Sequence, residues 1–303
     1  MALLGPYAQP NDTMKNLLGI TDAEELVVAE RRLTTLRVLE LHDGAAPAAT
    51  RGGFDAEHLR AIHQHLFQDV YGWAGTTRGD PLTLEGQRLQ QPSTLIKGMT
   101  EFEAPGRVNA QLDRLLSQLE RDDHLRGLSR EAFSDRAADL FGQLNQIHPF
   151  REGNGRTQRE FMLQFAAQAG HAIQFQGVTQ ERITLASFDA SQGDPSTIRR
   201  LFAEITDPDR ARFLERGLDT LQARYGNGVD ELYLATATPG REYAGQLHIK
   251  AGEHCILRGA GEIVVGQSRD LPRGAQPGAH VEMRASPFPT LAQEQQRQQG
   301  MEM

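Results

Sequence analysis

The sequence has a single cysteine, Cys255, among its 303 residues. A lone cysteine excludes a disulfide within the chain and any zinc site that needs two or more thiolates. It lies in the strand-like run HCILR, where a small buried apolar residue is the simplest interpretation. We therefore expect Cys255 to have a structural role only.

Positive charge is also scarce. Lysine and arginine number 32 against 40 aspartates and glutamates, and the net charge is −8. Phosphate backbones and anionic membrane surfaces attract basic proteins, so this balance argues against broad affinity for either. We expect no specific nucleic-acid partner, although a local basic patch can still bind one small anion such as a nucleotide.

Long apolar runs are missing. No stretch approaches the ~20 apolar residues that span a bilayer, and the N-terminus lacks the basic and apolar regions of a secretory signal. The sequence thus predicts no membrane span and synthesis in the cytoplasm. Export into a host or recipient cell by a route that needs no N-terminal signal stays open.

Helical spacing of apolar residues dominates the first three quarters of the chain. It predicts helices over 21–41, 54–70, 108–120, 129–147, 156–170 and 204–225. Leu26, Leu33, Leu36 and Leu39 share this spacing in the first helix, and Ser129 is the expected N-cap of the fourth. Residues 78–102 contain short alternating pieces, which predict a hairpin or an extended flap.

The character of the sequence changes after Gly226. Short β-rich pieces separated by Gly and Pro predict a small, mostly antiparallel barrel or sandwich. The Gln-rich end, residues 289–303, is polar and predicts a frayed tail.

The segment 148–159, HPFREGNGRTQR, mixes residues that a purely structural loop does not need. Pro149 disfavours the helical conformation at His148, so the preceding helix should end there. Gly153 and Gly155 let the backbone approach a ligand closely, just where the next helix begins. The unpaired N–H groups of a helix N-terminus attract anions.

Charged side chains in this segment suit phosphate chemistry. Arg156 and Arg159 are three positions apart, so on a helix they share one side and can hold a di- or triphosphate. Glu152 can hold a magnesium ion that bridges phosphate oxygens. His148 has a pKa suited to taking a proton from an incoming hydroxyl. Together these residues predict nucleotidyl transfer.

Each of these residues also has a simpler interpretation. His148 could cap a helix, Glu152 and Arg156 could form an exposed ion pair worth well under ~1 kcal/mol, and the glycines could merely form a turn. Their occurrence together in this order is not expected by chance. His63 and His65 are two apart on a helix and face different directions, so they predict no metal site.

The same segment resembles the signature of the Fic family, His-Pro-Phe-x-(Asp/Glu)-Gly-Asn-Gly-Arg-x-x-Arg, at every defined position. The resemblance implies a mainly α fold, with an all-helical Fic core and a β-hairpin flap, followed here by a small β-rich OB-like domain. It divides the chain into an N-terminal extension (1–20), a Fic domain (21–225), an OB-like domain (226–288) and a polar tail (289–303).

The resemblance further implies a magnesium-dependent protein adenylyltransferase. Such an enzyme moves AMP from ATP to a Tyr, Thr or Ser hydroxyl of a target protein. His148 would be the general base, Phe150 a core anchor of the loop and Glu152 the magnesium ligand.

Other residues acquire roles from the same resemblance. Arg156 would contact the β-phosphate and Arg159 the γ-phosphate, beside an anion hole formed by Gly153, Asn154 and Gly155. A β-hairpin flap would hold the target by strand pairing, and we favour Lys97, Gly98, Met99 and Thr100 as its working edge.

Many Fic proteins carry an inhibitory helix with the motif Ser/Thr-x-x-x-Glu-Gly/Asn. In this chain Glu precedes Gly or Asn only at Glu85 and Glu152, and Pro81 and His148 stand four residues earlier. The activity would therefore be constitutive, or a separate small antitoxin would supply the glutamate; we favour a toxin with an antitoxin. A Fic core followed by an OB-like domain also resembles bacterial effectors exported by type IV secretion systems.

Two other functions stay open. The same site could transfer UMP, GMP or phosphate, or a dead site could leave a binding scaffold. Intact Gly153 and Gly155 favour nucleotidyl over phosphoryl transfer, and intact His148 and Arg159 argue against a dead site. A nucleic-acid-binding module built on the β-rich segment is disfavoured by the acidic balance.

Overall fold

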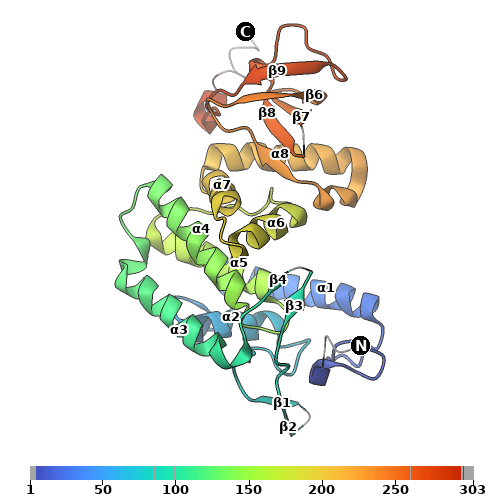
Figure 1. Cartoon of the computed structure of the whole chain (residues 1–303), viewed down its shortest axis with the longest axis vertical. Coiled ribbons are helices and arrows are strands. Elements are labelled where there is room, and N and C mark those ends of the chain that lie inside the picture. Colours follow the sequence, from blue (N-terminus) through green and yellow to red (C-terminus); the bar gives the residue numbers. More distant parts are fainter. Residues whose placement is uncertain (1–4, 85, 99, 260, 295, 297–303) are drawn as a thin grey trace. The chain divides into compact units, whose positions relative to one another are not determined.

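The computed structural model describes residues 5–84, 86–98, 100–259, 261–294 and 296. The chain divides into two compact units, Met1–His171 and Ala172–Met303, and each is described by itself (Figure 1).

The first unit is a helical bundle. Its helices are α1 (Ala23–His42), α2 (Ala56–Phe67), α3 (Pro105–Arg121), α4 (Arg130–Ile147) and α5 (Asn154–Ala169). Helix α2 packs against α1, α3 and α5, and α4 packs against α3 and α5. Fully buried side chains from three of these helices form the core: Leu59, Ile62, Phe133, Phe161 and Phe165. The segment 148–153 thus connects two helices of the core.

Local sequence explains where these helices begin. The side chains of Asp22, Asp55 and Ser129 each accept a backbone N–H in the first turn of α1, α2 and α4. The predicted cap at Ser129 is therefore confirmed. The predicted apolar face of α1 is only partly buried, because Leu36 is 58% and Leu39 52% exposed. The residues of α1 that are buried are Leu26 and Thr34, and Thr34 and Glu30 accept hydrogen bonds from Arg156 of α5.

The segment predicted as a flap contains two short antiparallel hairpins. The first pairs β1 (Leu82–Leu84) with β2 (Gln87–Leu89), and the second pairs β3 (Ile96–Lys97) with β4 (Thr100–Glu101). Lys97 lies opposite Thr100, and Gly98 takes a positive φ of 59° in the turn. Met99 lies outside the described residues.

The segment ahead of α1 packs on the first unit. Tyr7 is 1% exposed, and its ring meets that of Trp73 edge-on at 5.3 Å. The Tyr7 hydroxyl donates to Gln91 at 2.8 Å, which ties this segment to the base of the hairpins.

The second unit combines helices with a sheet. Helices α6 (Gln180–Ser191), α7 (Ser196–Ile205) and α8 (Pro208–Tyr225) precede strands β5 (Leu234–Thr236), β6 (Glu242–Ala251), β7 (His254–Arg258), β8 (Ile263–Gln267) and β9 (His280–Arg284). The strand order is β5-β8-β7-β6-β9, with β5 parallel to β8 and the other pairs antiparallel. Short 3₁₀ turns complete the two units at Gly5–Tyr7, Ala48–Thr50, Asp123–Leu125, Gly226–Glu231 and Ser268–Asp270.

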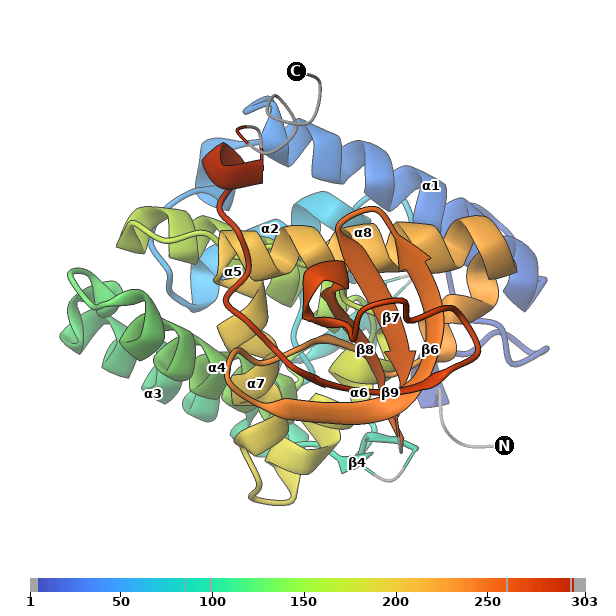
Figure 2. The same cartoon turned by 90° about the horizontal axis from the view of Figure 1, so that it is seen from above.

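Helix α8 lies along one face of this sheet (Figure 2). A Cβ at Gly217 would come within 2.4 Å of Val265 Cγ2, so glycine allows the close approach of helix and strand. Glu204 is fully buried and receives both arms of the Arg182 guanidinium at 2.7 and 2.8 Å. This ion pair joins α6 to α7, and the backbone N–H of Thr236 in β5 also donates to Glu204, at 3.0 Å.

The predicted mainly α fold with a small β-rich C-terminal part is confirmed. The compact units divide at residue 171, whereas the predicted domain limit lies at 225, because α8 packs on the sheet, α7 packs on α8 and α6 packs on α7. The domain limits taken from the family resemblance stay a prediction.

Two smaller expectations have clear outcomes. Cys255 is fully buried, as predicted. The tail is not frayed up to Glu294, which is 2% exposed and accepts hydrogen bonds from Arg212 and Arg216. Among the described residues, no helix combines the length and the apolar character needed to cross a membrane.

Candidate active site

The site is built on the turn between α4 and α5. Helix α4 ends at Ile147, and His148 follows in the left-handed conformation with φ 46°. Helix α5 begins at Asn154 after Gly153, whose φ is 84°. A left-handed histidine is uncommon and persists only where its surroundings hold it. The turn is therefore fixed by contacts outside its own sequence.

Asn154 fixes one side of this turn. Its side-chain oxygen accepts the N–H of Phe150 at 2.9 Å, and its amide donates to the Phe150 carbonyl at 2.7 Å. The residue is 3% exposed. Of the anion-hole role predicted for Asn154, only the backbone N–H is left available.

His63 of α2 fixes the other side. Its ring stacks on Phe150 with centroids 3.8 Å apart. Its Nδ1 accepts the N–H of Gly75 at 2.8 Å, and its Nε2 donates to the Glu152 carbonyl at 3.0 Å. Burial lowers the pKa of His63 to about 3, so the ring stays neutral. This role of His63 was not predicted from the sequence, where the residue was considered only as a possible metal ligand.

The two glycines of the signature serve different purposes. A Cβ at Gly153 would lie 2.4 Å from ring carbons of Phe67, so this position has no room for a side chain. A Cβ at Gly155 would meet only Arg159 Nη1, at 3.7 Å. Gly153 therefore allows the turn to pack on α2, and Gly155 leaves the first turn of α5 open.

The His148 side chain is 7% exposed and stacks on Phe102, with ring centroids 3.8 Å apart. Its Nδ1 lies 3.3 Å from the carbonyl oxygen of Asn145, which places the ring proton on Nδ1. Its Nε2 is buried and has no hydrogen-bond partner among the described residues. The free lone pair on Nε2 is what a general base needs.

Burial and nearby cations keep this imidazole neutral. Desolvation, followed by the charges of Lys97 and Arg78, holds the pKa of His148 well below its usual range. At neutral pH the ring is therefore unprotonated, and its Nε2 lone pair is not occupied by a proton.

Two charged residues of the signature are already paired. Glu152 Oε1 lies 2.8 Å from Lys97 Nζ, and both side chains are more than a third exposed: Glu152 at 35% and Lys97 at 40%. Arg156 forms an ion pair with Glu30 of α1 and donates to Thr34 at 3.0 Å. The structure thus brings the predicted flap lysine to the predicted metal ligand. It also places Glu30, which was not predicted from the sequence, beside Arg156.

Arg159 lies in a pocket of about 470 Å³ between α1 and α5, together with Glu30, Thr34, Arg156 and Glu160. Within the described part of the chain its guanidinium has no hydrogen-bond or ion-pair partner, and burial lowers its pKa. Glu160 is engaged by His42 at 2.9 Å. Among the described residues this pocket therefore presents to a ligand one guanidinium that makes no hydrogen bond or ion pair.

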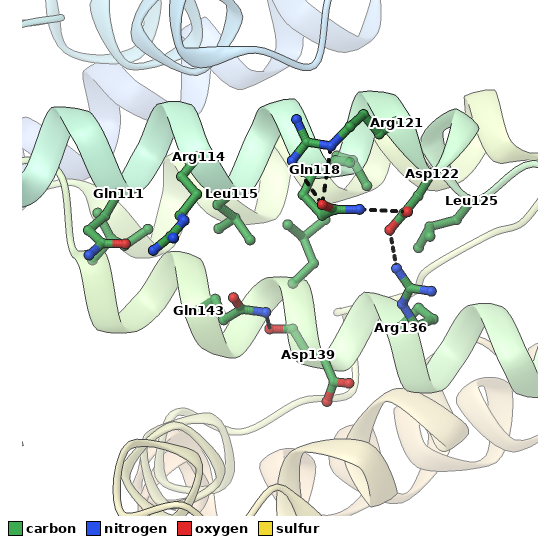
Figure 3. Close-up of a pocket in the computed structure, with 13 residues that line it drawn as sticks. Gln111, Arg114, Leu115, Gln118, Arg121, Asp122, Leu125, Arg136, Asp139 and Gln143 are labelled. Atoms are coloured by element: carbon green, nitrogen blue, oxygen red, sulfur yellow. Dashed lines mark hydrogen bonds and ion pairs between the residues drawn. The ribbon is translucent and has the colours of Figure 1, made fainter.

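A second groove, between α3 and α4, has a different character (Figure 3). Arg136 pairs with Asp122, which also accepts from Gln118 at 2.8 Å. Leu119 and Leu140 on its lining are buried. These contacts join the two helices and bring no catalytic group together.

Residues 53–166 match the model of the Fic/DOC family. The solved structure of the type IV secretion system effector protein BepA matches with a TM-score of 0.83 and 32% identity, over 94% of this chain and 97% of that one. The chain belongs to the Fic/DOC family. The predicted resemblance is thereby confirmed.

Two further proteins are similar to this chain. The structure of BepC from Bartonella tribocorum, solved with bound AMPPNP, is 32% identical with a TM-score of 0.63, over 69% of this chain and 99% of that one. A protein adenylyltransferase of Bartonella henselae is 34% identical over 270 residues, which are 88% of this chain and 49% of that protein. The chain thus spans about half the length of this relative.

The packing at Gly153 predicts a difference between two alanine variants. Gly153→Ala should lower the free energy of unfolding by about 1–3 kcal/mol, since the new Cβ overlaps Phe67 in a left-handed backbone. Gly155→Ala should change it by less than about 0.5 kcal/mol. Urea unfolding of both variants measures this, and equal losses would contradict the packing argument.

The buried neutral state of His63 predicts acid sensitivity. Its folded pKa of about 3 lies below the unfolded value, so the unfolded chain binds the extra proton. The contribution of His63 to the free energy of unfolding is therefore present above about pH 6.5, and it is lost as the pH falls toward 3. From pH 7 to pH 5 this residue alone should remove about 2 kcal/mol. Urea unfolding of wild type and His63→Asn at both pH values tests this: a pH dependence unchanged by the substitution would refute it.

Proposed function

We propose that the chain is a protein adenylyltransferase, which moves AMP from ATP to a hydroxyl of a target protein. The observation that carries the proposal is the unpaired Nε2 of His148, held on the turn that leads into the open N-terminus of α5. The AMPPNP-bound BepC structure and the adenylyltransferase relative support ATP as the donor.

The arrangement supports a single displacement at phosphorus. His148 Nε2 takes the proton from the target hydroxyl, and the oxygen attacks the α-phosphorus of ATP. The bond from that phosphorus to the oxygen bridging to the β-phosphate breaks, and pyrophosphate leaves. The proton stays on His148 until solvent removes it. Burial of the imidazole favours the neutral form that starts this step.

The nucleotide would lie at the first turn of α5. The backbone N–H groups of Gly153, Asn154 and Gly155 offer an anion hole. Arg156 suits the β-phosphate and Arg159 the γ-phosphate. Arg156 bonds Thr34 through Nη1 and Glu30 through Nη2, so a phosphate would bind its remaining N–H groups or replace Glu30.

Magnesium is the cation that we propose for this site, with Glu152 as its protein ligand. Mg²⁺ commonly binds through one or two carboxylates together with substrate phosphates, and Glu152 is a half-exposed carboxylate next to the anion hole. When bound, the cation would neutralise charge on the phosphate oxygens. Lys97 holds the same carboxylate and would have to release it.

The target would pair with the hairpin of β3 and β4. An extended segment can add to a free strand edge through main-chain hydrogen bonds, and Lys97, Gly98 and Thr100 offer such an edge. We also propose export, on the basis of the effector BepA; the chain would then act on a protein of another cell.

The alternatives are weaker. Transfer of UMP, GMP or phosphate is not favoured by the named relatives. A catalytically dead scaffold would not need a buried base without a partner, since such a nitrogen costs desolvation energy for no structural gain.

Transfer of labelled AMP tests the proposal. The chain should label a protein from α-labelled ATP and Mg²⁺ in bacterial or host-cell lysate, and His148→Ala should reduce this by at least about 100-fold. His280→Ala, an exposed position in the second unit, is the matched control.

Parallel reactions identify the nucleotide donor and the cell that contains the target protein. If label appears only from γ-labelled ATP, UTP or GTP, the reaction is transfer of phosphate, UMP or GMP and not of AMP. If labelling continues in the presence of EDTA, the reaction does not require magnesium. The lysate in which the band appears shows whether the target belongs to the producing cell or to another.

We further propose that a small antitoxin binds the pocket between α1 and α5. It would supply a glutamate to Arg159, the guanidinium without a partner in the described chain. Val27 and Val38 give one side of this pocket an apolar surface, which suits a partner helix.

Two neighbouring valines test this partner. Val27 lines the pocket, whereas Val28 does not, and both are exposed, at 58% and 48%. A small protein from the source cell that lowers AMP transfer should inhibit Val28→Asp as well as wild type, and Val27→Asp at least about 10-fold less, because a buried charge opposes docking. Equal inhibition of the two variants would place the partner elsewhere.

A further inference from the structure

Arg78 is a buried cation outside the signature that binds the main chain of the site. It is 3% exposed and precedes β1 in the chain. Its Nε donates to the His148 carbonyl at 2.8 Å, and its Nη2 donates to the Ile147 carbonyl at 2.9 Å. Its backbone N–H donates to the Pro149 carbonyl at 2.7 Å. One residue thus satisfies three consecutive carbonyls at the end of α4.

This arrangement solves two problems of the turn. The last carbonyls of a helix have no partners within the helix, and a cation is favourable at that end. His148 is also held in a left-handed conformation that costs free energy. A planar guanidinium reaches two neighbouring carbonyls at fixed angles, which a lysine cannot do.

The turn that carries Arg78 is itself rigid. Asp80 accepts the backbone N–H of Thr77 at 2.8 Å and the amide of Asn109 in α3 at 2.9 Å. Arg60 of α2 pairs with the same carboxylate. A Cβ at Gly79 would lie 2.8 Å from the Asn109 side chain, so the turn packs directly on α3. Arg78 is therefore held from two helices.

Arg78 has no ion-pair partner within the part of the chain that the structure describes, and burial lowers its pKa to about 10. Its charge acts on His148 together with those of Lys97 and Arg151, and all three lower the pKa of that imidazole. The Asn145 carbonyl, which faces Nδ1, acts in the opposite direction and raises this pKa.

We propose that Arg78 is the positioning residue of the active site: by binding the carbonyls of residues 147–149 it fixes the main chain of His148 and so the direction of Nε2. It acts through His148 and touches neither nucleotide nor target. The inference rests on the proposed function for its catalytic consequence, but not for its effect on the His148 ring.

Two substitutions separate geometry from charge. Arg78→Lys keeps the charge and loses the fork, and Arg78→Met loses both. Each should lower kcat for AMP transfer about 10- to 100-fold, since a base displaced by about 1 Å loses that much. The Kd for ATP, measured by equilibrium binding, should stay within about twofold. Arg114→Met, an exposed arginine of α3, is the control.

Ring NMR signals of His148 give a readout that a merely structural role would not change. Arg78→Met should raise the pKa of His148 toward its ordinary value, because a nearby positive charge is removed, and Arg78→Lys should raise it less. Loss of folding stability and of ATP binding in parallel with kcat, with an unshifted His148 titration, would overturn the proposal.

The two proposals fail differently. If wild type transfers no AMP, the proposed function fails, and the His148 ring signals of Arg78→Lys, which keeps the charge and loses the fork, still decide whether Arg78 positions the ring. If Arg78→Met does not fold, Arg78→Lys carries the test, and an unchanged kcat in that variant refutes positioning by the fork.

Discussion

The site depends on how closely the turn between α4 and α5 packs on α2. The backbone at Gly153 lies so near the Phe67 ring that no side chain fits between them. Interiors are packed too densely to absorb such an overlap without shifting an element. This contact fixes the distance between the turn and α2. It therefore also fixes the position of the first backbone N–H groups of α5.

Three further sets of contacts fix the main chain of the turn. His63 holds it from below through the Glu152 carbonyl, Asn154 bridges it internally through Phe150, and Arg78 holds its beginning. These are bonds to main-chain atoms, so they determine backbone shape without occupying the face that a ligand would use. The left-handed backbone conformation of His148 is unfavourable, and it is maintained because these contacts together stabilise it.

Much of this site could be predicted from the sequence, because the twelve residues of the signature are local. Pro149 marked the end of α4, and the glycines marked the start of α5. What could not be predicted depends on distant residues: Glu30 reaches Arg156 across 126 positions, and Lys97 reaches Glu152 across 55. Helices α6 and α7 were also missed. The apolar residues of α6 show little helical periodicity, whereas Ile198, Leu201, Phe202 and Ile205 of α7 follow it and are all buried, so α7 had a signal in the sequence.

The Lys97–Glu152 ion pair has a consequence for the order of events. The lysine belongs to the strand edge proposed for the target, and the glutamate to the site proposed for the cation. Any ligand that claims one partner frees the other, so the two binding equilibria share a free-energy term. By reciprocity, a cation that releases the lysine and a target that captures it must strengthen each other's binding equally. If the cation and the target bind as proposed, this one exposed ion pair would make their binding cooperative without a change of fold.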